Sequence, residues 1–400
     1  MRSVTHRRVV PDSRSSLIDR ACFILEKAWA NGLSEPSIDP EVLWDKAAKG
    51  SAPTAERNGR DSIDVQDFRE RLEKLCSSIS EEAELNALGK TIAHGQIVRI
   101  IRQRLSLGQL WGNRPQILET KLAPPIIVVG QMRSGTTRVH RLLAADPANC
   151  ATRFCDSWFP VPKAIDLRPI LGRMSLAIAR IMDPWIDELH PMGSQRPEEE
   201  LGWLASALGH STFDTQWRIP SFSRFCEGRN PDPVYNEFSR IMRSDAWHHK
   251  NYSKPRVLKV PQFSEELRSL TQQFSNARIV VAHRSHEEIL KSTISLVANQ
   301  MAIQSDGVDL DWIAEEWNRK LKLRQNRLEA DLSSFDGYVT HAYFDKLNDD
   351  WVSEIRKIYS DLKIDLTSNA LRQMKKEMER EDDRKHKSHG TQIKMFEKAA

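Results

Sequence analysis

The sequence has few cysteines, no long apolar run and no strong excess of charge, and each absence excludes a class of protein. Its five cysteines are an odd number without the spacing of a disulfide framework, which favours reduced thiols in a cytoplasmic protein. No apolar run approaches the ~18 residues that a membrane span requires. Lysine and arginine number 59 against 55 acidic residues, and the net charge of +4 suits a small anionic ligand better than a nucleic acid.

The N-terminal segment and the chain length set further bounds. Residues 1–14 are basic but contain no apolar core of a secretory signal, which agrees with a cytoplasmic location. A chain of 400 residues exceeds what one hydrophobic core usually fills, so we expect one large domain with a smaller segment attached. Apolar residues recur at helical spacing in residues 15–48 and 65–105, which we interpret as helices packed on the main domain.

One stretch, residues 125–143, combines the patterns of a strand, a glycine turn and a helix. A run of β-branched residues predicts a buried parallel strand. A turn bounded by Gly130 and Gly135 follows it, and Val139 and Leu142 then recur at helical spacing. A strand, turn and helix in this order aim backbone N–H groups and a helix N-terminus at a phosphate.

The two glycines have the spacing of a nucleotide P-loop, but the cation of this loop is in a different place. The residue after the second glycine is Thr136, where a kinase or ATPase has lysine. The positive charge lies inside the loop, at Arg133, where it would face a single 5′-phosphate and the group bonded to it. An ATP-dependent small-molecule kinase is therefore a weaker interpretation, and a plain turn between a strand and a helix is another alternative.

Two more strands with polar ends follow further along the chain. The pattern of residues 256–261 predicts a strand that carries Lys259 near its end, and residues 277–284 predict another that ends at Arg284. A helix carrying Ser292 comes next. This alternation of strands and helices predicts a parallel, doubly wound sheet. An arginine at a strand end and a hydroxyl on the next helix can hold one phosphate together, although each alone fits an ordinary surface cation or a neutral helix position better.

Two positions, one acidic and one imidazole, are candidates for the proton acceptor of a reaction. Asp156 follows a short strand predicted at residues 150–154, and the aromatic stretch after it would raise its pKa and make it a better base near neutral pH. His190 lies in a loop and needs no such shift, because an imidazole has a pKa of about 6.5. The glutamates that follow Pro197 indicate either a helix start or an acid that faces the substrate.

The motif Gly-x-x-Arg-Ser-Gly-Thr-Thr at residues 130–137 resembles the 5′-phosphosulfate loop of the sulfotransferases. The segment from residue 258 through Arg284 to Ser292 resembles the second half of their cofactor site. The likeness is to a bacterial-type branch with an N-terminal helical extension. It implies an α/β fold with a P-loop NTPase-like parallel sheet flanked by helices, divided into a helical extension at 1–120 and a sulfotransferase domain at 121–395.

The resemblance also implies a reaction. The donor would be 3′-phosphoadenosine 5′-phosphosulfate, used without a metal, and the acceptor a hydroxyl or amine of an apolar small molecule or glycan. Tryptophans between residues 158 and 247 indicate an apolar acceptor pocket, and the oligomeric state stays open. Lys259 would face the transferring group, with Asp156 or His190 as the base. The residues that would hold the donor are Arg133, Ser134, Gly135, Thr136, Thr137, Arg284 and Ser292.

Two departures from the family pattern leave room for a different function. Relatives often have glutamate at the position of Asp156 and histidine at the position of Phe263. Because a fold does not guarantee an activity, a binding or scaffold protein that has lost catalysis is an alternative from another class.

Overall fold

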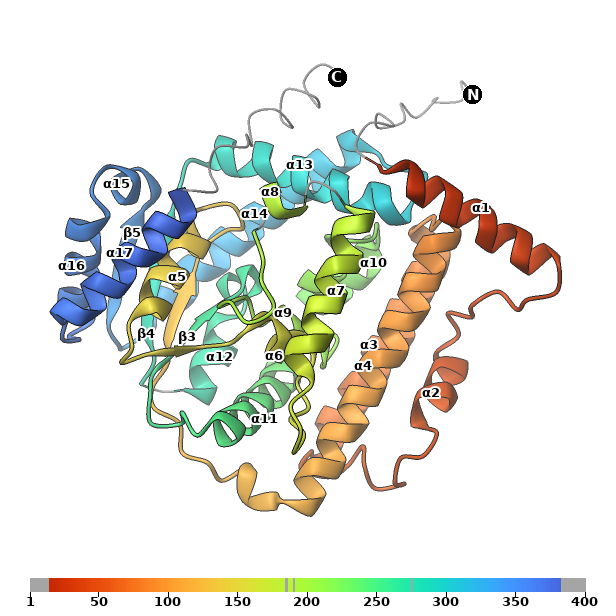
Figure 1. The fold of residues 1–400 in the computed structure, drawn as a ribbon, viewed down its shortest axis with the longest axis horizontal. Coiled ribbons are helices and arrows are strands. Elements are labelled where there is room, and N and C mark those ends of the chain that lie inside the picture. The colour runs from red at the N-terminus through yellow and green to blue at the C-terminus, as the bar shows by residue number, and fades with distance from the viewer. Residues whose placement is uncertain (1–13, 184–185, 190, 275, 383–400) are drawn as a thin grey trace.

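The structure is a computed structural model that describes residues 14–382 except 184–185, 190 and 275. It contains a five-stranded sheet in the order β2-β3-β1-β4-β5, and every neighbouring pair of strands is parallel; the sheet lies to the left in Figure 1. The predicted parallel α/β sheet is therefore confirmed. The strands are β1 (Ile126–Val129), β2 (Cys150–Ala151), β3 (Arg256–Lys259), β4 (Arg278–His283) and β5 (Val339–Tyr343).

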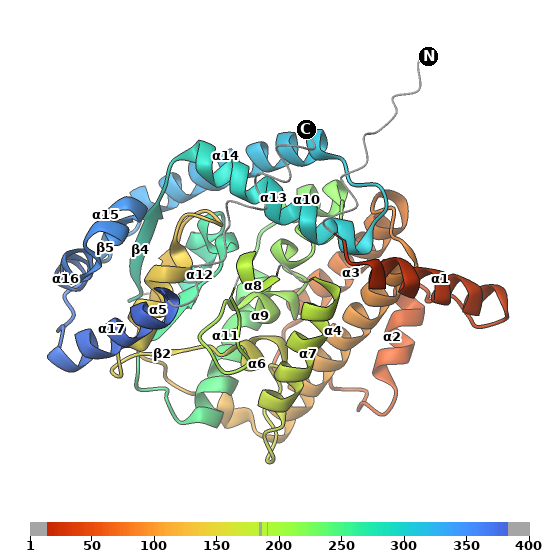
Figure 2. The ribbon, with the colours of Figure 1, turned by 45° about the horizontal axis from the view of Figure 1, so that its top comes forward.

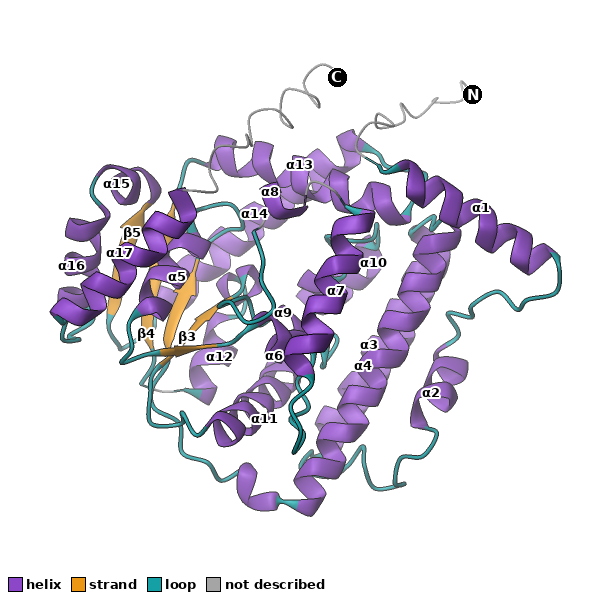
Figure 3. Ribbon diagram, in the orientation of Figure 1, coloured by secondary structure: helices purple, strands orange, loops and turns teal. Residues whose placement is uncertain are grey.

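Helices enclose both faces of this sheet (Figure 3). Successive residues of a strand point to opposite faces. In β1, Ile127 and Val129 therefore join a core with α9, α11 and α12, while Ile126 and Val128 join a core with α5, α16 and α17. These helices are α5 (Thr136–Ala145), α9 (Leu201–Ala205), α11 (Asp232–His249), α12 (Leu267–Gln273), α16 (Trp351–Asp361) and α17 (Ser368–Asp382).

The strand order determines where a ligand can bind. β1 lies between β3 and β4, and the chain leaves the sheet at the carboxyl end of each strand. In open parallel sheets, ligands bind outside these ends, where the strand order reverses. The loop after β1, the end of β3 and the end of β4 therefore meet at one edge of the sheet.

The N-terminal part of the chain is helical, as predicted, and each of its helices starts at a capping side chain. Ser15, Asp39, Asp61 and Asn86 each accept a hydrogen bond from a backbone N–H of the first turn. Such caps typically contribute about 1 kcal/mol each. The helices are α1 (Ser16–Ala30), α2 (Pro40–Ala48), α3 (Ser62–Glu82) and α4 (Ala87–Asn113).

The N-terminal helices share a core with a later part of the chain. Phe68, Leu75 and Ile97 from α3 and α4 pack in one cluster with Phe213 and Trp217. The predicted boundary at residue 120 stays a prediction, but the helices on its two sides bury their apolar faces together. The remaining elements include α6 (Phe154–Trp158), α7 (Arg168–Met182), α8 (Ile186–Leu189), α10 (Pro220–Glu227), α13 (His286–Gln304), α14 (Leu310–Ser333) and α15 (Phe344–Asp349).

The hairpin of α13 and α14 connects the sheet to these N-terminal helices (Figure 2). α13 contacts α4, and the amide N–H of Asn86 donates to the carbonyl of Gln304 at the end of α13 (3.0 Å). α14 packs on α12. Among the helices that the structure describes, none has both the length and the apolar character needed to cross a membrane.

A network of buried charges joins α6 to the start of β3. The carboxylate of Asp156 accepts hydrogen bonds from Arg153 (2.6 and 2.9 Å) and lies 3.3 Å from Nε2 of His249. His249 also contacts Asp245 (3.4 Å), which pairs with Arg256 at the beginning of β3 (2.7 Å). The network therefore ties α6 and α11 to the sheet.

The predicted rise in the pKa of Asp156 is wrong. Burial by itself would raise it, but hydrogen bonds from His249 and Arg153, together with the charge of Arg168, hold the pKa well below its ordinary range. The strand predicted at residues 150–154 is also shorter than expected, because the chain turns into α6 after Arg153. Although aromatic residues lie nearby, the carboxylate of Asp156 is surrounded by charged hydrogen-bond donors, which outweigh the effect of an apolar setting on its pKa.

His249 makes the stability of the protein depend on pH. Hydrogen bonds to Asp156 and Asp245 raise its pKa to about 9, against some opposition from burial. A histidine whose pKa is higher in the folded state stabilises the fold fully below its unfolded pKa of about 6.5, and this contribution is lost as the pH rises through about 9. We expect His249→Gln to lower the free energy of unfolding by roughly 2 kcal/mol at about pH 6 and by much less near pH 10.

Urea denaturation at the two pH values measures this difference. The neighbouring His248 is a matched control, because burial and the charge of Arg168 lower its pKa instead. His248→Gln should therefore show no excess loss at the lower pH. An equal loss at both pH values for His249→Gln would contradict the interpretation.

Candidate active site

The loop after β1 requires glycine at both of its ends. Gly130 has a φ of 146°, and a Cβ there would lie 2.8 Å from the carbonyl oxygen of Ala282. Gly135 has a φ of 91° and is the N-cap of α5, where a Cβ would lie 2.6 Å from the ring of Phe344. Residues with a side chain are strained at such angles. The loop can therefore turn tightly and present its backbone N–H groups and the start of α5 on one side.

Hydrogen bonds hold this loop in shape. The hydroxyl of Ser264 accepts from the N–H of Gly130 (2.9 Å) and lies 3.1 Å from its carbonyl. Ser134 donates to the carbonyl of Gln131 (2.6 Å), and the side-chain amide of Gln131 donates to the carbonyl of Leu321 on α14 (3.0 Å). The loop is thus anchored by its own residues and by two other segments, so that a ligand meets a formed cradle.

Two arginines and a serine converge on this loop. Nε of Arg133 donates to the hydroxyl of Ser292 on α13 (2.9 Å), and Nη1 of Arg284 donates to the backbone carbonyl of Arg133 (3.0 Å). Burial and the charge of Arg284 lower the pKa of Arg133 to about 10. A lowered arginine pKa means that the positive form is destabilised, and an anion bound nearby would relieve this.

Lys259 lies at the carboxyl end of β3, beside the same loop. Its ammonium group donates to the hydroxyl of Thr137 (3.2 Å) and forms an ion pair with the carboxylate of Glu199. The backbone N–H of Lys259 donates to the carboxylate of Glu200 (3.0 Å). Burial raises the pKa of Glu200 to about 8, although the bond from Lys259 opposes the rise. Of the two carboxylates, Glu199 is therefore the one that pairs with the ammonium group of Lys259.

Glu199 bears on both interpretations of the acidic run after Pro197. The helix α9 begins only at Leu201, so the glutamate at position 199 precedes the helix and its carboxylate reaches Lys259. An antiparallel bridge between Arg153 and Pro197 brings this segment beside the sheet. The sequence signalled an acid here but not its partner, which is 60 residues away along the chain.

The two predicted bases have different outcomes. The carboxylate of Asp156 lies in the ion network at the start of β3, whereas Lys259 ends that strand. Arg256 and Lys259 are three positions apart on this strand, which corresponds to about 10 Å. The partners of Asp156 are Arg153, Arg168 and His249, and its lowered pKa removes the argument from a raised one, so its role as a base stays a prediction. His190 lies outside the described residues, and its role stays a prediction.

An aromatic residue that the sequence analysis did not single out completes the loop. Phe344 follows β5 directly and touches Gly135, and the guanidinium group of Arg284 lies 4.4 Å from the centre of its ring. Arg138 lies on the same ring at 6.0 Å. In the sequence, the signal that could have identified Phe344 was an aromatic residue directly after a strand. Phe344 offers a flat apolar surface next to the cations of the loop.

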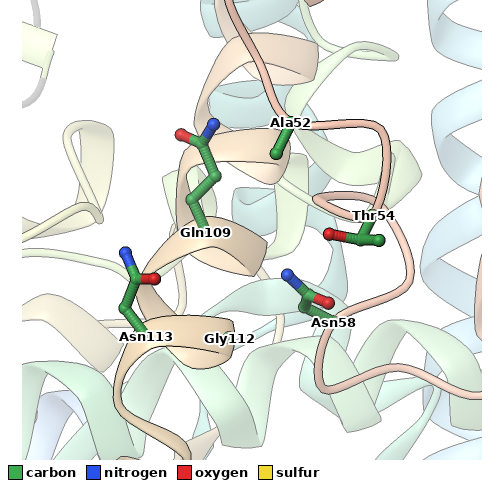
Figure 4. Close-up of a pocket in the computed structure, with 6 residues that line it drawn as sticks. All are labelled: Ala52, Thr54, Asn58, Gln109, Gly112 and Asn113. Atoms are coloured by element: carbon green, nitrogen blue, oxygen red, sulfur yellow. The ribbon is translucent and has the colours of Figure 1, made fainter.

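Two of the tryptophans that suggested an aromatic acceptor pocket belong to the hydrophobic cores instead. Trp203 and Trp217 are fully buried in the cores, where Trp217 stacks on Phe213 with ring centres 5.6 Å apart. A hollow of about 560 Å³ lies elsewhere, between the end of α4 and the loop before α3 (Figure 4). No charged or titratable side chain lines it, so it lacks the chemistry of the loop.

The sequence model described as the Sulfotransferase family matches residues 124–368. The chain belongs to the sulfotransferase family. The matched segment contains the glycine loop, Lys259, Arg284 and Ser292. The prediction of a sulfotransferase enzyme is thereby confirmed. The roles assigned to single residues are not tested by the match and stay predictions.

Solved structures of sulfotransferases share this fold. The sulfotransferase STF1 from Mycobacterium tuberculosis H37Rv superposes with a TM-score of 0.73 at 21% identity, covering 92% of this chain and 99% of that one. The sulfotransferase STF9 from Mycobacterium avium gives 0.74 at 18% identity, covering 87% and 88%. No curated protein sequence matches the chain. The coverage of STF1 includes most of the N-terminal helices, so the likeness of fold extends beyond the family match.

Proposed function

We propose that this sulfotransferase transfers a sulfonyl group from 3′-phosphoadenosine 5′-phosphosulfate to a hydroxyl or amine of an apolar small molecule or glycan. The observation that carries the proposal is the convergence of Arg133, Lys259 and Arg284 on one glycine loop that has Thr136 in place of a lysine. Cations and backbone N–H groups arranged in this way favour a ligand with several phosphate oxygens.

The residues present fit such a donor. The loop from Gly130 to Gly135 is a cradle in which side chains at the glycines would clash, and it leads directly into the start of α5. Ser134, Thr136 and Thr137 would bind the 5′-phosphosulfate from this cradle. When bound, the donor supplies an activated sulfonyl group. Arg284 and Ser292, which both contact Arg133, would bind its 3′-phosphate.

Lys259 and Glu199 support a division of roles at the reacting end. Lys259 is shared between the hydroxyl of Thr137 on the loop and the carboxylate of Glu199. An anion at the loop would compete with Glu199 for this ammonium group, because both are negatively charged. Glu199 would then be released to accept the proton of the acceptor. Lys259 and Arg133 would stabilise the negative charge that develops on the leaving phosphate oxygen.

A comparison of nucleotides tests the proposed donor. Because Thr136 replaces the lysine that contacts a γ-phosphate, we expect 3′-phosphoadenosine 5′-phosphate to raise the melting temperature in the presence of EDTA. ATP with magnesium should not raise it. Stabilisation by ATP and magnesium alone would contradict the proposal and support a kinase.

The phosphate role of Arg284 predicts a selective loss of affinity. Arg284→Ala removes a charge-assisted hydrogen bond to the 3′-phosphate and should cost about 1.5–3 kcal/mol in the binding of 3′-phosphoadenosine 5′-phosphate. Adenosine 5′-phosphate, which lacks the 3′-phosphate, should bind the variant about as well as it binds the wild type. Calorimetric titration of both ligands measures the difference, and equal losses would mean that Arg284 is structural.

The base assignment predicts a contrast between two carboxylates. Glu199→Gln should reduce kcat by about 10²–10⁴-fold while the donor product binds with near-normal affinity, since only the proton acceptor is lost. Asp156→Asn is the matched control, because its carboxylate belongs to the ion network and should mainly affect stability. Turnover with a panel of hydroxyl and amine acceptors measures both. A large loss of kcat in Asp156→Asn alone, at unchanged stability, would return the role to Asp156.

A further inference from the structure

The outward face of α7 is apolar, although it is exposed. Its large side chains are between 41% and 58% exposed and recur at helical spacing. An ordinary surface helix carries polar residues on its exposed side. The residues of this face are Ile170, Leu171, Met174, Ile178 and Ile181.

The opposite face of α7 is firmly attached to the protein, so the exposed residues are not a misplaced part of the core. Gly172 and Leu176 are buried, and a Cβ at Gly172 would clash with the side chains of Ser194 and Cys155. At the C-terminal end, the carboxylate of Asp183 accepts a hydrogen bond from Asn299 on α13 (2.9 Å). The orientation of the helix is therefore determined from both ends.

Exposed cations outnumber exposed acids around this face, although Asp187 on α8 pairs with Arg180 (2.6 Å). Between residues 163 and 181, all of which the structure describes, the exposed charged side chains are Lys163, Arg173 and Arg180. The acid in this stretch, Asp166, is partly buried and accepts hydrogen bonds from Arg168. The apolar surface continues ahead of the helix at two residues that are 77% and 54% exposed, Ile165 and Leu167.

We propose that this face of α7 docks on the surface of an anionic lipid bilayer, with the helix lying in the plane of the interface. An apolar face flanked by basic residues is the pattern of helices that bind in this way. At 15 residues the helix is about 22 Å long, which suits an interfacial position and not a span. Pairing with a second copy of the chain would bring Lys163 and Arg173 of the two copies together, and the exposed acid of this edge, Asp187, already pairs with Arg180; anionic lipid head groups balance these cations directly.

Docking at this face would orient the candidate active site. The hydroxyl of Ser194 donates to the carbonyl of Pro169 on α7 (2.7 Å), and Arg180 donates to the carbonyl of Met192 (3.1 Å). The segment that α7 contacts here leads directly to Glu199. A bilayer against α7 would therefore lie on the side of the protein from which this segment approaches Lys259. The inference about the bilayer does not depend on the identity of the donor.

Vesicle sedimentation of the full-length chain tests the proposal. The wild type should bind vesicles of phosphatidylcholine and phosphatidylglycerol and bind phosphatidylcholine alone much more weakly. Met174→Glu combined with Ile178→Glu should reduce binding to the anionic vesicles by about tenfold or more, because it places charge on the apolar face. Arg173→Gln should reduce it by roughly fivefold, since one basic residue near an anionic surface contributes about that factor.

A variant of an exposed apolar residue elsewhere on the protein serves as a matched control, because it tests whether any exposed apolar side chain supports vesicle binding. Ile63 on α3 is 67% exposed, and Ile63→Glu should leave vesicle binding unchanged. Melting temperatures with and without 3′-phosphoadenosine 5′-phosphate verify that each variant is folded. Absence of wild-type binding to the anionic vesicles would overturn the proposal, as would equal binding by the double variant. A wild-type dimer in sedimentation velocity that the double variant makes monomeric would also overturn it, in favour of an interface between copies.

Discussion

The site depends on positive charges held close together at one edge of the sheet. Arg133, Lys259 and Arg284 come from the ends of three neighbouring strands, and all of them contact or adjoin the same glycine loop. Like charges repel, and burial adds to the cost of each. The protein offsets this with individual partners, namely Ser292, Glu199 and Glu288. An anion would be a further partner for these cations and would compete with Glu199 for Lys259, so the architecture favours an anionic ligand before any substrate is considered.

The surrounding helices keep this edge in place through buried ion pairs as well as apolar cores. Arg60, ahead of α3, pairs with Glu237 on α11 (2.6 Å), and both side chains are almost fully buried. Lys320 on α14 contacts Asp214 (2.8 Å) and Glu227 (3.2 Å) in the same manner. Removing one partner of such a pair typically costs about 3–5 kcal/mol, because the other charge is left buried. The N-terminal helices and the α13–α14 hairpin are therefore held to the sheet domain by ion pairs in which loss of either partner is strongly destabilising.

The role of each charged group depends on how many partners it already has in the folded protein. Asp156 has two arginines and His249 around it, so its proton affinity is low and its role is to connect α6 with α11 and β3. Glu199 shares one lysine with the loop, and an arriving anion can change that balance. The same reasoning applies to α7, whose apolar side chains on one face are exposed while Gly172 and Leu176 on its inner face are buried. The structure thus separates groups that stabilise the fold from groups that are available to a ligand or a surface.

The sequence alone determined the elements whose signal is local. The β-branched run before Gly130, the glycine spacing and the displaced cation at Arg133 lie within a few residues of one another, and they predicted the loop, the parallel sheet and the family. The ends of β3 and β4 were predicted for the same reason. The tertiary structure decided which carboxylate meets Lys259, because Glu199 and Lys259 are 60 residues apart and their contact depends on how the chain returns to the sheet. It also decided the pKa of Asp156, since the partners that lower it include Arg168 and His249, and spacing along a chain does not report such distant neighbours.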